Sequence, residues 1–288
     1  MKLLVCGASG YIGKHLAAQG ATSMKVLTTS SSGREGTICL DLARAGDFDV
    51  GVLDRGDVVA LAAAISAPDI CANDRQRALA VNVDGTSLLI ERALGRGARV
   101  AFFSSDTVYG ERSEAFDESA PVHPAGDYAQ MKNEVERRYT GEAGFKSLRL
   151  SYVFSRQDKF TSFLEACHKK GVTAEIFDPF VRSVVHRQDV VDGVLALARN
   201  WELHPQSIFN FGGPQALSRV AYVQALRETV WADLAYTVVT PEDAFFRNRP
   251  RNIHMRCDGL ALLLGRTPST LVEAARLEFD IPLERYFG

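Results

Sequence analysis

Two kinds of hydrophobic pattern alternate through the first half of the chain. Short runs rich in β-branched and aromatic residues, typical of buried strands, lie at residues 2–6, 24–28, 37–40, 58–62, 99–104 and 145–151. Between them lie amphipathic stretches with the period of a helix, such as residues 74–94 and 127–139. This alternation predicts an α/β fold, a doubly wound parallel sheet with helices on both faces. Ligands of such a sheet bind where its strands end.

A glycine-rich turn, GASGYIG at residues 7–13, lies between the first strand and an amphipathic stretch. Strand, glycine turn and helix form the context of a dinucleotide-binding turn in a Rossmann-type sheet. Gly7 permits the tight turn, Gly10 lets the backbone approach a pyrophosphate, and Gly13 lets the helix pack closely on the strand. The phosphates would then lie at the helix N-terminus. A turn in which the glycines only relieve steric crowding is the alternative.

The second half of the chain has a looser pattern. Helices are predicted at residues 161–170, 189–199, 218–229 and 270–279, with short strands and turns between them. We therefore expect a Rossmann domain that binds NAD(P) over residues 1–155 and a smaller, mostly helical substrate-binding lobe over residues 156–288. The segment 181–200 is expected to return to the first domain.

A second motif, YAQMK, places the phenol of Tyr128 and the ammonium group of Lys132 on one face of a helix. A neighbouring positive charge favours phenolate, so such a tyrosine could exchange a proton near neutral pH. The strand at residues 99–104 runs into a turn that presents Ser105 and Thr107 at the ligand edge of the sheet. Each feature has a plain alternative, a solvated ion-pairing face for the helix motif and turn capping for the hydroxyls.

These motifs, taken in their order, resemble the extended short-chain dehydrogenase/reductase family of nucleotide-sugar epimerases, dehydratases and 4-keto reductases. Further matching segments make the resemblance cover nearly the whole chain: NVDGT at residues 82–86, RSVVHRQDV at 182–190, Arg249-Pro250 and residues 258–268. The resemblance implies a catalytic set of Ser105, Tyr128 and Lys132. Ser105 would donate a hydrogen bond to the substrate carbonyl, and Tyr128 would supply or accept the proton. Lys132 would lower the pKa of the phenol and hold the ribose hydroxyls of the cofactor.

The resemblance also implies residues that contact the two ligands. Those expected to bind the cofactor are Gly7, Ser9, Gly10, Tyr11, Ile12, Gly13, Ser30, Arg34, Asp41, Leu42, Ala62, Ala63, Asn82, Ser104, Tyr128, Lys132 and Val153. Those expected to contact the substrate are Ser105, Asp106, Thr107 and Arg182.

Several of these residues have a structural alternative. Arg182 is a candidate clamp for a substrate diphosphate, because guanidinium binds phosphate through parallel donors, or it is an exposed arginine at a strand start. Asn82 could contact the cofactor or bond the backbone. His186 and Trp201 are expected to be packing residues.

The choice of cofactor depends on the end of the second strand, where NAD-specific turns place a carboxylate. Residues 28–32 are Thr-Thr-Ser-Ser-Ser, and Arg34 follows within reach of the loop. This pattern favours NADP(H), with NAD(H) as the alternative if Glu35 folds back toward the site.

The residues after the catalytic serine bear on the reaction. Ser105 is followed by Asp106 and Thr107, not by the Asp-Glu pair of the family's 4,6-dehydratases, so dehydration is disfavoured. The compact second lobe is similar to that of the 4-keto reductases. We therefore expect an NAD(P)H-dependent reductase of a nucleotide-linked 4-keto-6-deoxyhexose. The alternatives are a nucleotide-sugar epimerase that retains NAD and a non-catalytic cofactor-binding regulatory protein. Residues 154–156, Phe-Ser-Arg, depart from the family's Tyr-Gly-Pro and leave the sugar open.

The composition and charge of the chain limit the classes of partner that it can bind. The formal net charge of −2 argues against nucleic acid or an anionic membrane as the main partner, and no apolar run approaches the ~20 residues of a spanning helix. The chain enters its first strand at once, so we expect no signal peptide and a cytoplasmic location. Five scattered cysteines and six histidines without ligand spacing predict neither disulfides nor a metal site. A homodimer is the candidate assembly.

Overall fold

The computed structural model describes residues 1–34 and 36–282. A seven-stranded sheet forms its centre, in the order β11-β6-β5-β4-β1-β2-β3, with all neighbouring strands parallel. Its strands are β1 Lys2–Cys6, β2 Lys25–Ser30, β3 Ile38–Cys39, β4 Val58–Leu61, β5 Arg99–Ser105, β6 Phe145–Leu150 and β11 Ile208–Phe211. Strands β4 and β6 are buried along their whole length, as expected where helices cover both faces of a parallel sheet.

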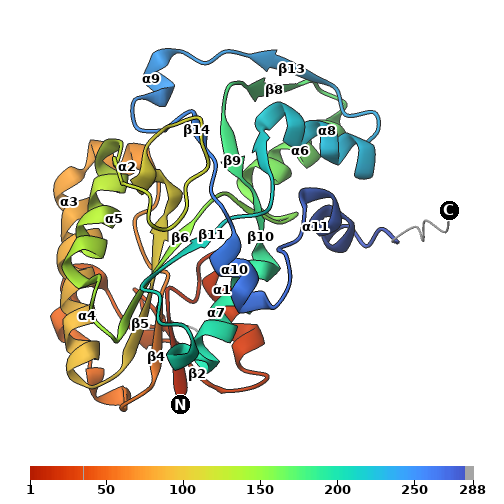
Figure 1. The fold of residues 1–288 in the computed structure, drawn as a ribbon. Coiled ribbons are helices and arrows are strands. Elements are labelled where there is room, and N and C mark those ends of the chain that lie inside the picture. The colour runs from red at the N-terminus through yellow and green to blue at the C-terminus, as the bar shows by residue number, and fades with distance from the viewer. Residues whose placement is uncertain (35, 283–288) are drawn as a thin grey trace.

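Helices cover the two faces of the sheet (Figure 1). On one face lie α1 Gly13–Gly20, α7 Arg187–Arg199 and α10 Asp258–Leu264, and on the other α3 Arg75–Leu79, α4 Thr86–Gly95 and α5 Gly126–Tyr139. Strand β1 shows why both faces need cover. Leu3 and Val5 enter the core beneath α1 and α7, whereas Leu4 and Cys6 enter the core beneath α4 and α5, because successive side chains of a strand alternate.

A smaller lobe lies above the end of the sheet where its strands finish (Figure 1). Its helices are α6 Lys159–Lys170, α8 Arg219–Thr229, α9 Asp243–Phe246 and α11 Leu271–Glu278. Its strands are β8 Ala174–Phe177, β9 Val181–Ser183, β12 Ala216–Ser218, β13 Tyr236–Val239 and β14 Asn252–Ile253. The paired strands β7 Val153–Phe154 and β10 Val185–His186 join this lobe to the main sheet. Phe154, Leu164, Ile176 and Tyr222 belong to its separate hydrophobic core.

The connecting segments complete the fold. Helix α2 Pro68–Asn73 precedes α3, and a π-helical turn, Ala80–Gly85, joins α3 to α4. Short 3₁₀ turns occupy Leu42–Asp47, Val50–Val52, Asp106–Tyr109 and Trp201–Leu203.

The pattern of the sequence predicted most of these elements. The first strand is confirmed at residues 2–6, and the other five expected strands are found with ends shifted by a residue or two. The helix expected over residues 74–94 consists of α3, the π-helical turn and α4. Strand β11, which completes the sheet beside β6, was not predicted, because Asn210 interrupts its short apolar run.

Three further observations concern the described part of the chain. None of its helices is both long enough and apolar enough to cross a membrane. In residues 1–34 and 36–282, no cluster of three or more His, Cys, Asp or Glu side chains is arranged to hold a metal ion. All five cysteines are free thiols, and burial raises the pKa of Cys6 to about 12.

Candidate active site

The glycine turn between β1 and α1 is wound too tightly for larger residues. Gly7 has a φ of +85°, and a Cβ atom there would lie 3.1 Å from the backbone of Ala63. A Cβ atom on Gly13 would lie 2.2 Å from the carbonyl oxygen of Gly7. The Gly10 N–H closes the turn on that same carbonyl at 2.9 Å. The turn is therefore a cradle for a close-approaching group at the N-terminus of α1, which suits a pyrophosphate.

The order of the strands places this cradle where ligands of such sheets bind. β1 lies between β4 and β2, so the strand order changes direction there and the glycine turn lies at the topological switch point of the sheet. Ser9, Gly10 and Tyr11 lie at the surface of the turn, and Ile12 is partly buried. Ala62 and Ala63 follow β4 at the same edge.

Asn82 holds the loop that follows β4. Its Oδ1 accepts a hydrogen bond from Ile65 N at 2.9 Å, and its Nδ2 donates to Ile65 O at 2.9 Å. The side chain is 1% exposed. Asn82 therefore bonds the backbone, one of its two expected roles, and it fixes the loop that continues from Ala62 and Ala63.

The loop after β2 presents hydroxyl groups and one guanidinium. Ser30 Oγ accepts from Gly33 N at 3.1 Å and shares a hydrogen bond with Thr37 Oγ1 at 2.6 Å. Arg34 is exposed, and its backbone carbonyl accepts from Thr37. Glu35, the residue on which the NAD alternative depended, lies outside the described residues.

Asp41 and Leu42 close the neighbouring edge beyond β3. The carboxylate of Asp41 caps the following 3₁₀ turn by accepting from Ala43 N at 3.0 Å, and it lies 3.5 Å from Arg44. Leu42 is buried in the core beneath α4. Asp41 is only partly buried, and its second oxygen faces Arg44 at this edge of the sheet.

Lys132 is held against strand β5 by helix α5. Its Nζ donates to Phe103 O at 2.8 Å and lies 4.5 Å from the ring centroid of Phe102 and 5.8 Å from that of Tyr128. The residue is 2% exposed, and burial lowers the pKa of Lys132 to about 8. The ammonium group is thus fixed between the strand and the tyrosine.

Tyr128 precedes Lys132 by one helical turn and is partly buried. Burial raises the pKa of Tyr128, and the nearby Cys71 and Asp106 add to the increase. The sequence argument expected Lys132 to lower this pKa. The net direction is the opposite, because desolvation of the buried phenol is the largest contribution to this pKa. The tyrosine therefore holds its proton and is equipped to donate it.

The turn after β5 gathers hydroxyl groups around one carboxylate. Ser105 Oγ accepts from Thr107 Oγ1 at 2.9 Å and donates to Asp106 Oδ1 at 3.3 Å. Ser151 Oγ donates to Asp106 Oδ2 at 2.9 Å. Burial raises the pKa of Asp106. Beside them, Ser104 Oγ is buried and has no hydrogen-bond partner among the described residues, so its hydroxyl is free for a polar ligand or a water molecule.

Arg182 approaches the same carboxylate from strand β9. Its Nε lies 3.5 Å from Asp106 Oδ2, its Nη1 donates to Val181 O at 2.6 Å, and its Nη2 donates to Pro250 O at 2.7 Å. The residue is 7% exposed, and burial lowers the pKa of Arg182. Each nitrogen of this guanidinium thus contacts a protein oxygen.

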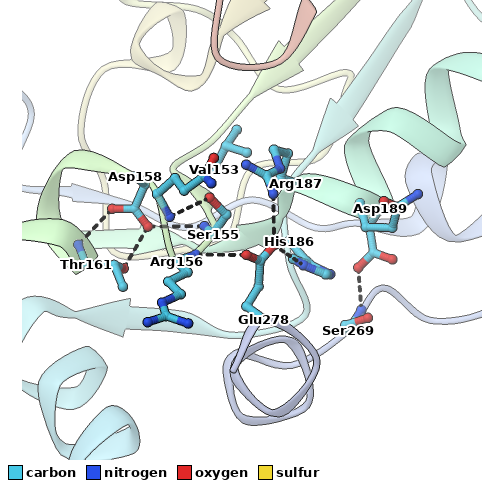
Figure 2. A network of polar contacts seen from close by, with 12 residues as sticks. Val153, Ser155, Arg156, Asp158, Thr161, His186, Arg187, Asp189, Ser269 and Glu278 are labelled. Carbon is cyan, nitrogen blue, oxygen red and sulfur yellow. Dashed lines mark hydrogen bonds and ion pairs between the residues drawn. The ribbon is translucent and has the colours of Figure 1, made fainter. Parts of the chain in front are cut away.

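Tyr11 connects the glycine turn to the loop that follows β7. Its hydroxyl donates to Ser155 Oγ at 2.6 Å and lies 3.4 Å from Val153 O. Asp158 holds the other end of this loop by accepting from Ser155 N at 3.1 Å and capping α6 (Figure 2). The loop that replaces the family's Tyr-Gly-Pro is therefore fixed to the cradle.

Glu278 at the end of α11 joins the same region, and nothing in the sequence signalled it. Figure 2 shows its carboxylate between His186, Arg187 and the backbone of Arg156. The distances to His186 Nε2 and Arg187 Nη2 are both 3.2 Å. The guanidinium carbon of Arg187 lies 5.4 Å from the Tyr11 ring centroid, so α11 is coupled to the glycine turn.

Comparison with protein families identifies the chain. Residues 1–277 match the family model of the RmlD substrate binding domain. The chain belongs to the RmlD family. This RmlD-family protein is therefore an enzyme, an NAD(P)-dependent oxidoreductase of the extended short-chain dehydrogenase/reductase type, and the resemblance found in its motifs is confirmed.

Individual relatives extend over nearly the whole chain. A protein named dTDP-4-dehydrorhamnose reductase from Sinorhizobium fredii is 25% identical over 99% of this chain and 99% of its own length. One of the same name from Mycobacterium tuberculosis is 26% identical over 93% of this chain and 88% of its own. Among solved structures, MoeE5 in complex with UDP-glucuronic acid and NAD superposes with a TM-score of 0.81 at 21% identity, covering 98% of each chain. That similarity shows the shared fold.

Proposed function

We propose that this RmlD-family enzyme is an NAD(P)H-dependent reductase of a nucleotide-linked 4-keto-6-deoxyhexose. The observation that carries the proposal is the position of Ser105, Tyr128 and Lys132 where β5 and α5 meet, at the same edge of the sheet as the glycine cradle. The two relatives named dTDP-4-dehydrorhamnose reductase support the substrate class, because they match over nearly their full lengths.

The residues around the cradle fit a nicotinamide dinucleotide. The turn at Gly7 and Gly13 has room only for backbone, as a pyrophosphate site requires. The unsatisfied Ser104 Oγ lies at the end of strand β5, which is separated from β1 by β4. We infer that the N-terminus of α1 holds the pyrophosphate and that Lys132 holds the ribose hydroxyls near the nicotinamide. When bound, the reduced nicotinamide supplies the hydride for the sugar carbonyl carbon.

The chain's own groups then handle the carbonyl oxygen. Ser105 donates a hydrogen bond that orients the oxygen, and Tyr128 transfers its proton as negative charge develops there. The raised pKa of Tyr128 keeps the proton on the phenol until it is needed. Lys132 stabilises the phenolate left behind, and solvent returns the proton to Tyr128.

We further propose that the cofactor is NADP(H). Residues 28–32 place no carboxylate at the end of β2, and the exposed Arg34 is the cation closest in sequence to that strand end. A 2′-phosphate carries about two negative charges, which a guanidinium binds and a carboxylate repels.

A substrate panel tests the proposal. Purified protein is mixed with dTDP- and UDP-linked 4-keto-6-deoxyhexoses and either NADPH or NADH, and the loss of reduced-cofactor absorbance is followed. We expect turnover with at least one of them, and a kcat about 10² to 10⁴ lower in Tyr128→Phe. Absence of turnover in folded protein that binds cofactor would contradict the proposal. Stoichiometric NAD released from the denatured protein would instead indicate an epimerase.

A further inference from the structure

We propose that Arg219 binds the diphosphate of the nucleotide-linked substrate, and that Arg182, the residue that the family resemblance implied, does not. This inference rests on the proposed function, because it assigns a residue to that substrate. It follows from how the protein itself uses the two guanidinium groups.

Arg182 is already neutralised and satisfied within the protein. Its Nε faces the Asp106 carboxylate at 3.5 Å, and its two terminal nitrogens donate to the backbone carbonyls of Val181 and Pro250. Turning this guanidinium toward a diphosphate would weaken both carbonyl contacts and draw it away from the buried carboxylate of Asp106, which would be left without its counter-ion. Arg182 therefore serves to hold Asp106 beside Ser105.

Arg219 begins helix α8 next to Arg182. Strand β12 pairs antiparallel with β9, with Ser218 opposite Val181, and Arg219 N donates to Phe180 O at 3.1 Å. The ring of Phe180 contacts both guanidinium groups, at 4.2 Å from the guanidinium carbon of Arg182 and 5.3 Å from that of Arg219. The two cations are thus neighbours around one aromatic ring.

The guanidinium of Arg219 is held by aromatic faces and has no carboxylate partner. Its carbon lies 3.9 Å from the ring centroid of Phe160 and 4.5 Å from that of Tyr152. Throughout residues 1–34 and 36–282, no carboxylate oxygen lies within 4.0 Å of it, and its buried Nη1 finds no hydrogen-bond acceptor. Aromatic faces orient a guanidinium without neutralising it, so its charge remains for an anion.

Both Asp158 and Arg219 contact Tyr152, but Asp158 forms no ion pair with the Arg219 guanidinium among the described residues. Its Oδ1 accepts from the Tyr152 hydroxyl at 2.6 Å and its Oδ2 from Thr161 Oγ1 at 2.7 Å. The Tyr152 hydroxyl therefore links Asp158 to Arg219, and among the described residues no direct ion pair joins the carboxylate to the guanidinium.

The space beside the two arginines suits phosphate oxygens. Arg182 and Arg219 both line a cavity of about 10 Å³, whose wall also includes Tyr152, Phe180 and Ser218. That is room for about one water-sized group, such as a phosphate oxygen, and not for a sugar ring. Asp106 connects Arg182 to Ser105, so a diphosphate bound at the cavity lies one layer of side chains from the carbonyl-binding hydroxyl.

The test is calorimetric titration of dTDP and of UDP into the whole protein saturated with NADPH. Arg219→Gln is compared with wild type, with Arg219→Lys, and with Arg227→Gln, which removes a charge near the other end of α8. We expect Arg219→Gln to weaken diphosphate binding by about 10- to 100-fold, the range for one charge-assisted hydrogen bond. Arg219→Lys should lose less, and Arg227→Gln should bind like wild type.

The controls separate this inference from the proposed function. NADPH affinity should be equal in all four proteins, which shows that the cofactor domain is intact. Two results would overturn the role of Arg219 and leave the reductase proposal standing. One is that Arg219→Gln binds dTDP with wild-type affinity. The other is that the Gln and Lys variants lose equal affinity with a matching fall in melting temperature. Failure of the wild type to bind any nucleoside diphosphate would overturn the proposed function, and this inference with it.

Discussion

Replacing Lys132 with methionine should abolish turnover and yet stabilise the cofactor-free fold. The side chain is 2% exposed, and burial lowers its pKa from 10.5 to about 8. A fall of about 2.5 units corresponds to roughly 3 kcal/mol spent in keeping the ammonium group charged inside the protein at neutral pH. Methionine has a similar length and no charge, so it removes this cost.

One loss opposes that gain. Lys132 Nζ donates to Phe103 O at 2.8 Å, and methionine removes this hydrogen bond, at a cost of about 1–2 kcal/mol. The net expectation is that Lys132→Met raises the free energy of unfolding by about 1–2 kcal/mol at pH 7. Such an exchange of stability for activity is common where a buried charge serves catalysis.

The pH dependence gives a sharper test than the magnitude. As pH rises past about 8, the folded protein releases the Lys132 proton while the unfolded chain keeps it to about 10.5. The unfolded state then binds more protons, so wild-type stability rises relative to the variant. The advantage of Lys132→Met should be complete below pH 8 and should shrink above it.

Urea unfolding of both cofactor-free proteins, measured in steps from pH 6.5 to 9.5, tests this reasoning. Adding NADPH should stabilise the wild type more than the variant, because the ammonium group holds the ribose in the proposed site. A variant less stable than the wild type at pH 7 by more than about 1 kcal/mol, or a stability difference independent of pH, would refute the argument that burial controls this lysine.

Three further outcomes are expected. Tyr128→Phe should lower kcat by about 10² to 10⁴ while NADPH affinity persists, because only the proton donor is lost; steady-state kinetics near the wild type would contradict the assignment. Arg34→Ala should weaken the binding free energy of NADPH by about 1–3 kcal/mol and leave that of NADH nearly unchanged, as measured by fluorescence titration. Equal losses for both cofactors would show that Arg34 does not contact the 2′-phosphate. Glu278→Gln should remove the counter-ion of Arg187 and lower the hydrogen-exchange protection of α11 by about 1–2 kcal/mol, whereas unchanged protection would show that its carboxylate does not hold the helix.

The parts of the site that depend on local sequence were predictable. The glycine turn is predicted from its position between one strand and the helix after it. The spacing of Tyr128 and Lys132 places both residues on one face of α5. Both features are short-range, so the periodicity of the chain determines them.

The parts that depend on long-range burial were not. Spacing alone does not show how deeply a side chain is desolvated, so the direction of the Tyr128 pKa was predicted wrongly. The pairing of Arg182 with Asp106 and of Arg187 with Glu278 joins segments far apart in sequence, and a single charged residue carries no signal of its partner. Strand β11 was missed for a related reason, because its place is decided by pairing with β6.

The late position of β11 and α10 in the chain also bears on its synthesis. Phe209 of β11 and Leu260 of α10 belong to the same core as Leu3 and Val5 of β1. A nascent chain that has emerged only to residue 155 therefore exposes one edge of β6 and part of the apolar face that α7 and α10 later cover. The roughly one hundred residues still needed take about 5–20 s to translate. For that interval the half-built sheet has an unpaired strand edge and an uncovered apolar face, so ribosome stalling between residues 155 and 264 would favour aggregation.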